Sequence, residues 1–145
     1  MEVRKRLTSG LRARFRPWPV VPFLLGFLSA AASGQSMISV TEAARLVAAD
    51  DNVIILDVRS SAEFAASHLS GAANLSVEDE RFDDAAARLD PDKTYIVHCT
   101  ANPEEGRSSR ALEKMERLGF SRLYSLEGGY VAWKEAELPL TEVDQ

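Results

Sequence analysis

The stretch "NVIILDVR" (Asn52–Arg59) contains a short, uninterrupted apolar run rich in β-branched residues. Such a run is typical of a strand that is buried on both faces of a parallel sheet. A second run of this kind, "KTYIVHC" (Lys93–Cys99), ends at the only cysteine of the chain. Both runs end in residues that can carry chemistry, Asp57 and Arg59 in the first and Cys99 in the second. We therefore predict two strands whose carboxyl ends form one edge of a sheet, where sites occur in such folds.

Segments with helical spacing alternate with these apolar runs. Ser39 lies three residues before Glu42, and Ser60 lies three residues before Glu63, so each pair predicts a capping box at a helix start. Further helices are expected in 77–89, 107–119 and 130–139, and further short strands in 71–76 and 121–129. This alternation predicts an α/β fold of βαβ units, with a short parallel sheet and helices on both faces, in one domain over 38–140.

The N-terminal segment differs in composition from the rest of the 145-residue chain. Residues 1–16 hold six Lys and Arg residues, and an apolar run of about 13 residues over 20–32 leads into small residues. Residues 1–34 therefore predict a signal peptide and a periplasmic or secreted protein that meets the membrane only transiently. The alternative is an uncleaved anchor in the inner membrane, although the run is shorter than the ~20 apolar residues that a spanning helix needs.

Beyond residue 16 the chain is acidic, because 11 Lys and Arg residues face 21 Asp and Glu residues, a net charge of −10. Nucleic-acid binding relies on clustered Lys and Arg side chains, so we expect no nucleic-acid partner. We also expect a monomer.

The single cysteine allows two interpretations. One Cys cannot form an internal disulfide, so Cys99 is either a buried apolar residue or a reactive thiol. A polar loop follows it, and a helix is predicted to start at Arg107. Backbone N–H groups of such a loop and the positive end of a helix stabilise a negative charge, which is the form of a thiol that acts as a nucleophile.

The two histidines do not point to a metal or a catalytic base. His98 precedes Cys99 on the same predicted strand, and neighbours on a strand face opposite sides, so we expect a structural role. His68 is expected in a loop. Because the sequence has no Cys/His cluster with metal-ligand spacing, we expect no metal site and no cofactor.

Four segments in this order resemble the rhodanese-like family: "ILDVRSSAEFAASHLSGAANL", "YIVHC", "GRSSRALEKMERLGF" and "LEGGYVAW". Rhodaneses are sulfurtransferases. The resemblance implies that Cys99 accepts a sulfane sulfur as a persulfide and passes it to a thiophilic acceptor. The implied partners are a small sulfur-containing donor and an acceptor such as a protein thiol.

The resemblance also assigns roles to residues near the cysteine. The active-site loop and substrate-binding residues would be Thr100, Ala101, Asn102, Pro103, Glu104, Glu105, Gly106, Arg107 and Ser108. Asp57 and Arg59 match the family's "DVR" element and would support the loop from the neighbouring strand. We expect Glu63 only to cap its helix, and Gly128, Gly129 and Trp133 to shape and pack the last helix.

One departure from the family pattern concerns this loop. Rhodanese loops usually place the arginine five residues after the cysteine, whereas here Arg107 follows Cys99 by eight residues. The inserted Glu104 and Glu105 would disfavour a doubly charged donor such as thiosulfate. The main hypothesis is a secreted sulfurtransferase, and the alternative is a catalytically weak rhodanese-like module that binds a partner or senses sulfide.

Overall fold

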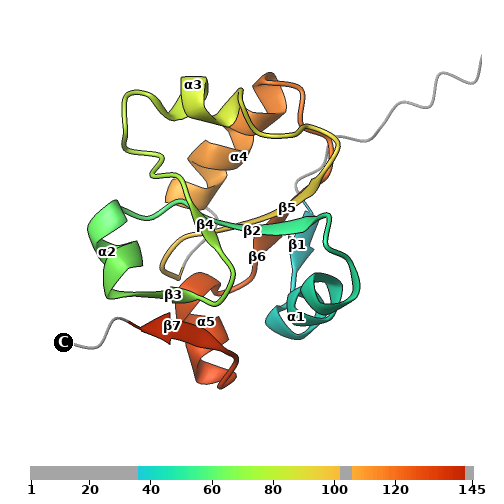
Figure 1. Ribbon diagram of the computed structural model, residues 1–145, viewed down its shortest axis with the longest axis vertical. Helices are drawn as coiled ribbons and strands as arrows, with labels where there is room; N and C mark the ends of the chain where they lie inside the picture. Colours follow the sequence, from blue (N-terminus) through green and yellow to red (C-terminus); the bar gives the residue numbers. More distant parts are fainter. Residues whose placement is uncertain (1–35, 102–105, 143–145) are drawn as a thin grey trace, which may run out of the picture. The chain divides into compact units, whose positions relative to one another are not determined.

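The computed structural model describes residues 36–101 and 106–142, in which the main sheet has the strand order β1-β6-β5-β2-β4 (Figure 1). All of its neighbouring strands are parallel. Its strands are β1 (Ser36–Ile38), β2 (Val53–Asp57), β4 (Ala73–Asn74), β5 (Thr94–His98) and β6 (Leu123–Leu126). The predicted parallel sheet is confirmed, and β1 is an addition that the sequence pattern did not reveal.

The helices lie on both faces of this sheet, as predicted. They are α1 (Val40–Ala49), α2 (Ser61–Ala66), α3 (Phe82–Ala86), α4 (Arg107–Arg117) and α5 (Gly129–Glu135). Figure 1 shows α3 and α4 on one face and α1 and α5 on the other. Within the described ranges, no helix has the length and apolar character needed to cross a membrane. The expected signal segment, residues 1–34, lies outside the described residues.

Each face of the sheet has its own apolar core, which explains the uninterrupted apolar runs of the central strands. Tyr95 and Val97 of β5 pack on the α3 and α4 side with Phe82 and Met115. Ile96, between them in the sequence, packs on the other side with Trp133 of α5. Alternate side chains of one strand thus enter opposite cores, so both sets must be apolar.

Both predicted helix starts have a serine cap, but the full capping box is confirmed for α2 and not for α1. The Ser39 hydroxyl accepts from the backbone N–H of Glu42 at the start of α1. Ser60 and Glu63 form the complete reciprocal box at the start of α2. Helix α3 is shorter than the acidic segment 77–89 predicted, because Val77 instead pairs its backbone N–H with the Val58 carbonyl.

A second, two-stranded sheet was not predicted. Strands β3 (Ser67–Leu69) and β7 (Leu140–Glu142) pair antiparallel. His68, which was expected in a loop, lies in β3, with its ring 3.8 Å from the Phe64 ring and Nδ1 2.8 Å from the Phe64 carbonyl oxygen. Its role is local packing between α2 and β3.

Candidate active site

Cys99 follows β5 directly and belongs to the core on the α4 side of the sheet. Its sulfur lies 3.4 Å from the hydroxyl oxygen of Ser108, in the first turn of α4. Both side chains are buried, with 5% of Cys99 and 1% of Ser108 exposed. The start of α4 therefore lies beside the sulfur, as the sequence predicted, and the Ser108 hydroxyl can donate to a thiolate there.

Helix α5 holds the backbone of the loop that follows the sulfur. The N–H of Tyr130 donates to the Cys99 carbonyl at 2.9 Å, and the N–H of Val131 donates to the Thr100 carbonyl at 2.9 Å. In a trans peptide the N–H points away from the C=O, and the described chain has no cis bond. The N–H groups of Thr100 and Ala101 therefore point away from α5, and the carbonyl contacts fix the orientation of both peptide groups.

This close approach depends on Gly129, at the first position of α5. Its φ is +55°, and a Cβ placed there would lie 2.5 Å from the Cys99 carbonyl oxygen. Gly129 was expected to shape the last helix, and it also gives the Cys99 loop room to bind α5. The clue in the sequence was a glycine pair at the end of β6, the strand beside β5.

Arg107 opens α4 and binds Glu63 with both ends of its guanidinium group. Its Nη1 lies 2.6 Å from Glu63 Oε2, and its Nη2 lies 2.9 Å from Glu63 Oε1. Nη2 also donates to the Thr100 hydroxyl at 2.8 Å. The prediction that Glu63 only caps α2 is therefore wrong. Its carboxylate also joins α2 to both sides of the Cys99 loop.

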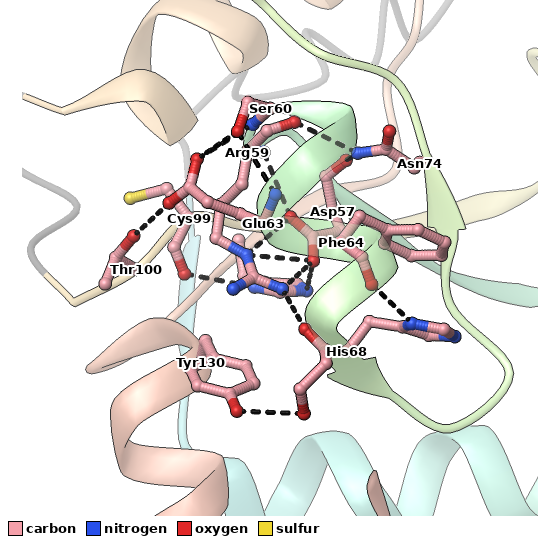
Figure 2. A network of polar contacts seen from close by, with 12 residues as sticks. Asp57, Arg59, Ser60, Glu63, Phe64, His68, Asn74, Cys99, Thr100 and Tyr130 are labelled. Atoms are coloured by element: carbon pink, nitrogen blue, oxygen red, sulfur yellow. Dashed lines mark hydrogen bonds and ion pairs between the residues drawn. The ribbon is translucent and has the colours of Figure 1, made fainter. Parts of the chain in front are cut away.

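The Glu63 carboxylate accepts hydrogen bonds from several side chains. Figure 2 shows its carboxylate between Ser60, whose hydroxyl donates at 2.6 Å, and Thr100, whose hydroxyl lies 3.3 Å away. The hydrogen bond from Arg107, assisted by those from Ser60, holds the pKa of Glu63 far below its usual range. The same contact raises the pKa of Arg107 above its usual value. The pair therefore stays ionised at any pH at which the protein would work.

Asp57 and Arg59 form a buried ion pair at the end of β2. Arg59 Nε lies 3.0 Å from both Asp57 carboxylate oxygens, and Nη2 lies 2.6 Å from Oδ2. Nη2 also donates to the Ser67 carbonyl at 2.8 Å, and the guanidinium lies 4.4 Å from the centre of the Tyr130 ring. Figure 2 shows this network beside Cys99, with Tyr130 beneath it. Tyr130, whose backbone N–H binds the Cys99 carbonyl, thus connects the ion pair to the loop.

His98 lies on the opposite face of β5 from Cys99, as strand alternation predicted. Its ring is fully buried, with Nδ1 3.1 Å from the Cys99 carbonyl oxygen and Nε2 3.6 Å from Asp57 Oδ2. Burial lowers the pKa of His98, and the nearby Asp57 only partly opposes this shift. A neutral ring on the far side of the strand fits a structural residue and not a base for the thiol.

The structure brings most of the predicted site residues together. Thr100, Gly106, Arg107 and Ser108 lie around Cys99 or its loop, and Ala101 is exposed. The predicted loop residues Asn102, Pro103, Glu104 and Glu105 lie outside the described residues. In the part of the chain that is described, no group of three His, Cys, Asp or Glu side chains could hold a metal ion.

Comparison with known proteins shows the family. The rhodanese-like domain model matches residues 39–136, and the chain belongs to this family. An uncharacterized protein of Synechocystis is 34% identical over 89 residues, 61% of this chain and 47% of that protein. The thiosulfate sulfurtransferase GlpE of Stutzerimonas stutzeri is 35% identical over 82 residues, 56% of this chain and 70% of GlpE. The chain thus spans about half of the first of these relatives.

The fold is shared with solved structures. The rhodanese-like domain of the Anabaena protein Alr3790 superposes with a TM-score of 0.64 at 24% identity, covering 76% of this chain and 81% of that domain. The similarity at this level shows the fold, and the family membership rests on the match of the rhodanese-like domain model.

Proposed function

We propose that this protein is a sulfurtransferase that carries a sulfane sulfur as a persulfide on Cys99 and passes it to a thiophilic acceptor. The observation that supports this most is the setting of the sulfur. It lies at a strand end, 3.4 Å from the Ser108 hydroxyl, beside a loop whose carbonyls bind α5. A buried cysteine that only filled space would need neither the hydroxyl nor the oriented loop.

The reaction has two displacements at sulfur. The Cys99 thiolate attacks the terminal sulfur of a donor, the S–S bond of the donor breaks, and the leaving group departs with the electron pair. Cys99 then holds a persulfide. An acceptor thiolate or cyanide attacks its outer sulfur, the new S–S bond breaks, and the Cys99 thiolate is restored. No external oxidant or reductant is needed.

The surrounding residues stabilise the charge at each stage. The Ser108 hydroxyl donates to the sulfur, and the start of α4 adds the positive end of its dipole. Tyr130 and Val131 fix the first two peptide groups of the loop through their carbonyls. Groups that are held in place in this way before the reaction need no rearrangement when charge develops on the sulfur.

The second candidate is a rhodanese-like module that binds a partner or senses sulfide with little turnover. Two observations favour it: only 5% of Cys99 is exposed, and Arg107 is engaged by Glu63.

A turnover experiment separates the two candidates. With protein in catalytic amount, inorganic polysulfide as donor and cyanide as acceptor, we expect the thiocyanate formed above a protein-free control to exceed one equivalent of protein by far. The rate measured by colorimetric detection of thiocyanate should fall to the uncatalysed level for Cys99→Ser. One equivalent or less per protein above that control would instead support the binding or sensing module.

We also propose that the protein acts outside the cytoplasm as a monomer after removal of its N-terminal segment. The support is the order of basic, apolar and small residues in 1–34. N-terminal sequencing of material from the native host should give a start between Ser33 and Ser36. Recovery of the chain with Met1 in a membrane fraction would support the anchored alternative.

A further inference from the structure

The charges beside the nucleophile are arranged unlike those of an anion-binding site. Arg107 is the basic side chain that starts α4, and Glu63 engages both ends of its guanidinium group at 2.6 and 2.9 Å. Glu78 Oε2 lies 3.9 Å from Nη1 of the same group. These three side chains therefore carry a net charge of −1, where an unpaired arginine would supply +1.

The cluster is close enough to Cys99 to act on a donor. Thr100, the residue after the nucleophile, accepts from Arg107 and approaches Glu63. Arg107 also starts the helix whose next residue, Ser108, has its hydroxyl 3.4 Å from the Cys99 sulfur. The Arg107 and Glu63 side chains are only 20% and 36% exposed, so water screens them less than fully exposed charges.

The geometry points to donor selection by the Glu63–Arg107 pair: the site takes its sulfur from organic persulfides of low charge in preference to thiosulfate. This rests on the proposed function and names its substrate class. In both cases the Cys99 thiolate attacks the outer sulfur and the donor S–S bond breaks. A persulfide RSSH gives the Cys99 persulfide and a thiolate RS⁻. Thiosulfate gives the Cys99 persulfide anion and the sulfite dianion, so two negative charges must enter and leave beside Glu63 and Glu78.

Glu63→Gln is the variant that tests the selection. Glutamine also serves at this position of a capping box and can still accept from Arg107, so it removes the charge with little change of shape. We expect the ratio of kcat/KM for thiosulfate to kcat/KM for the persulfide of 2-mercaptoethanol to rise about tenfold at low ionic strength. The rise should shrink as salt is added, because the added ions screen the charges.

Two further variants separate this effect from general damage. Glu78→Gln, at a more exposed position with 53% of its side chain accessible, should raise the same ratio by a smaller factor and is expected to fold normally. Glu116→Gln, near the opposite end of α4 from Arg107, makes the same change of charge and should leave the ratio unchanged.

The outcomes distinguish this inference from the function on which it rests. If both donors load Cys99 and the ratio is the same in wild type, Glu63→Gln and Glu78→Gln, donor selection is overturned and the sulfurtransferase stands. An equal rise in Glu116→Gln would overturn it too, because the whole chain's charge would then be the cause. Failure of both donors to load Cys99 in any variant would overturn the function and the selection together.

Discussion

Asp57→Asn should lower the free energy of unfolding by about 3–5 kcal/mol, because it leaves the Arg59 guanidinium buried without an anion. Both side chains are almost inaccessible, with 5% of Arg59 and none of Asp57 exposed. Asparagine keeps the size of the side chain but offers a single neutral oxygen. Urea denaturation followed by circular dichroism measures the loss, as a lower midpoint at an unchanged slope.

The chain contains a matched control for this experiment. Asp79 and Arg81 repeat the Asp-x-Arg spacing, and Arg81 also donates its backbone N–H and Nε to Asp79 Oδ1. Their side chains are 43% and 83% exposed, so Asp79→Asn should leave the denaturation midpoint nearly unchanged. Equal effects of Asp57→Asn and Asp79→Asn would mean that the buried pair does not stabilise the fold.

A double substitution adds a further check on the cause. Asp57→Asn combined with Arg59→Met removes both charges, so no charge stays buried without a partner. It should be more stable than Asp57→Asn alone. If the double variant lost as much stability as Asp57→Asn and Arg59→Met lose separately when their effects are added, the ion pair would not be the cause of the loss in Asp57→Asn.

The features that the sequence predicted well are encoded locally. Continuous apolar runs predicted β2 and β5, and serine with glutamate at a spacing of three predicted the starts of α1 and α2. Each pattern works within a few residues and follows from burial on two faces or from unsatisfied N–H groups at a helix start. The thiol at the end of β5 could be placed in the same way.

The features that were missed depend on contacts between distant segments. Glu63 and Arg107 are 44 residues apart, and a capping box already gave Glu63 a sufficient local role. Position 129 needs a glycine because the Cys99 carbonyl oxygen lies too close for a side chain. The two residues meet only because β5 and β6 are neighbours in the sheet. Strands β3 and β7 have three residues each, too few to show an alternating pattern.

Cys99→Ser is the other substitution with a large expected effect, and the effect is on chemistry. A serine hydroxyl does not form an anionic nucleophile near neutral pH and cannot hold a persulfide, so loading with sulfur should be abolished. Stability should change little, because oxygen replaces sulfur in one small side chain at a strand end. The Ser108 hydroxyl can still form a hydrogen bond to the new side chain.

Intact mass spectrometry tests the persulfide directly. Wild-type protein is incubated with the persulfide of 2-mercaptoethanol, freed of excess donor and measured with and without a reductant. The predicted result is a gain of about 32 Da, the mass of one sulfur atom, which the reductant removes and which Cys99→Ser does not show. An unchanged mass in wild type, or the same gain in Cys99→Ser, would contradict the assignment of Cys99 as the sulfur carrier.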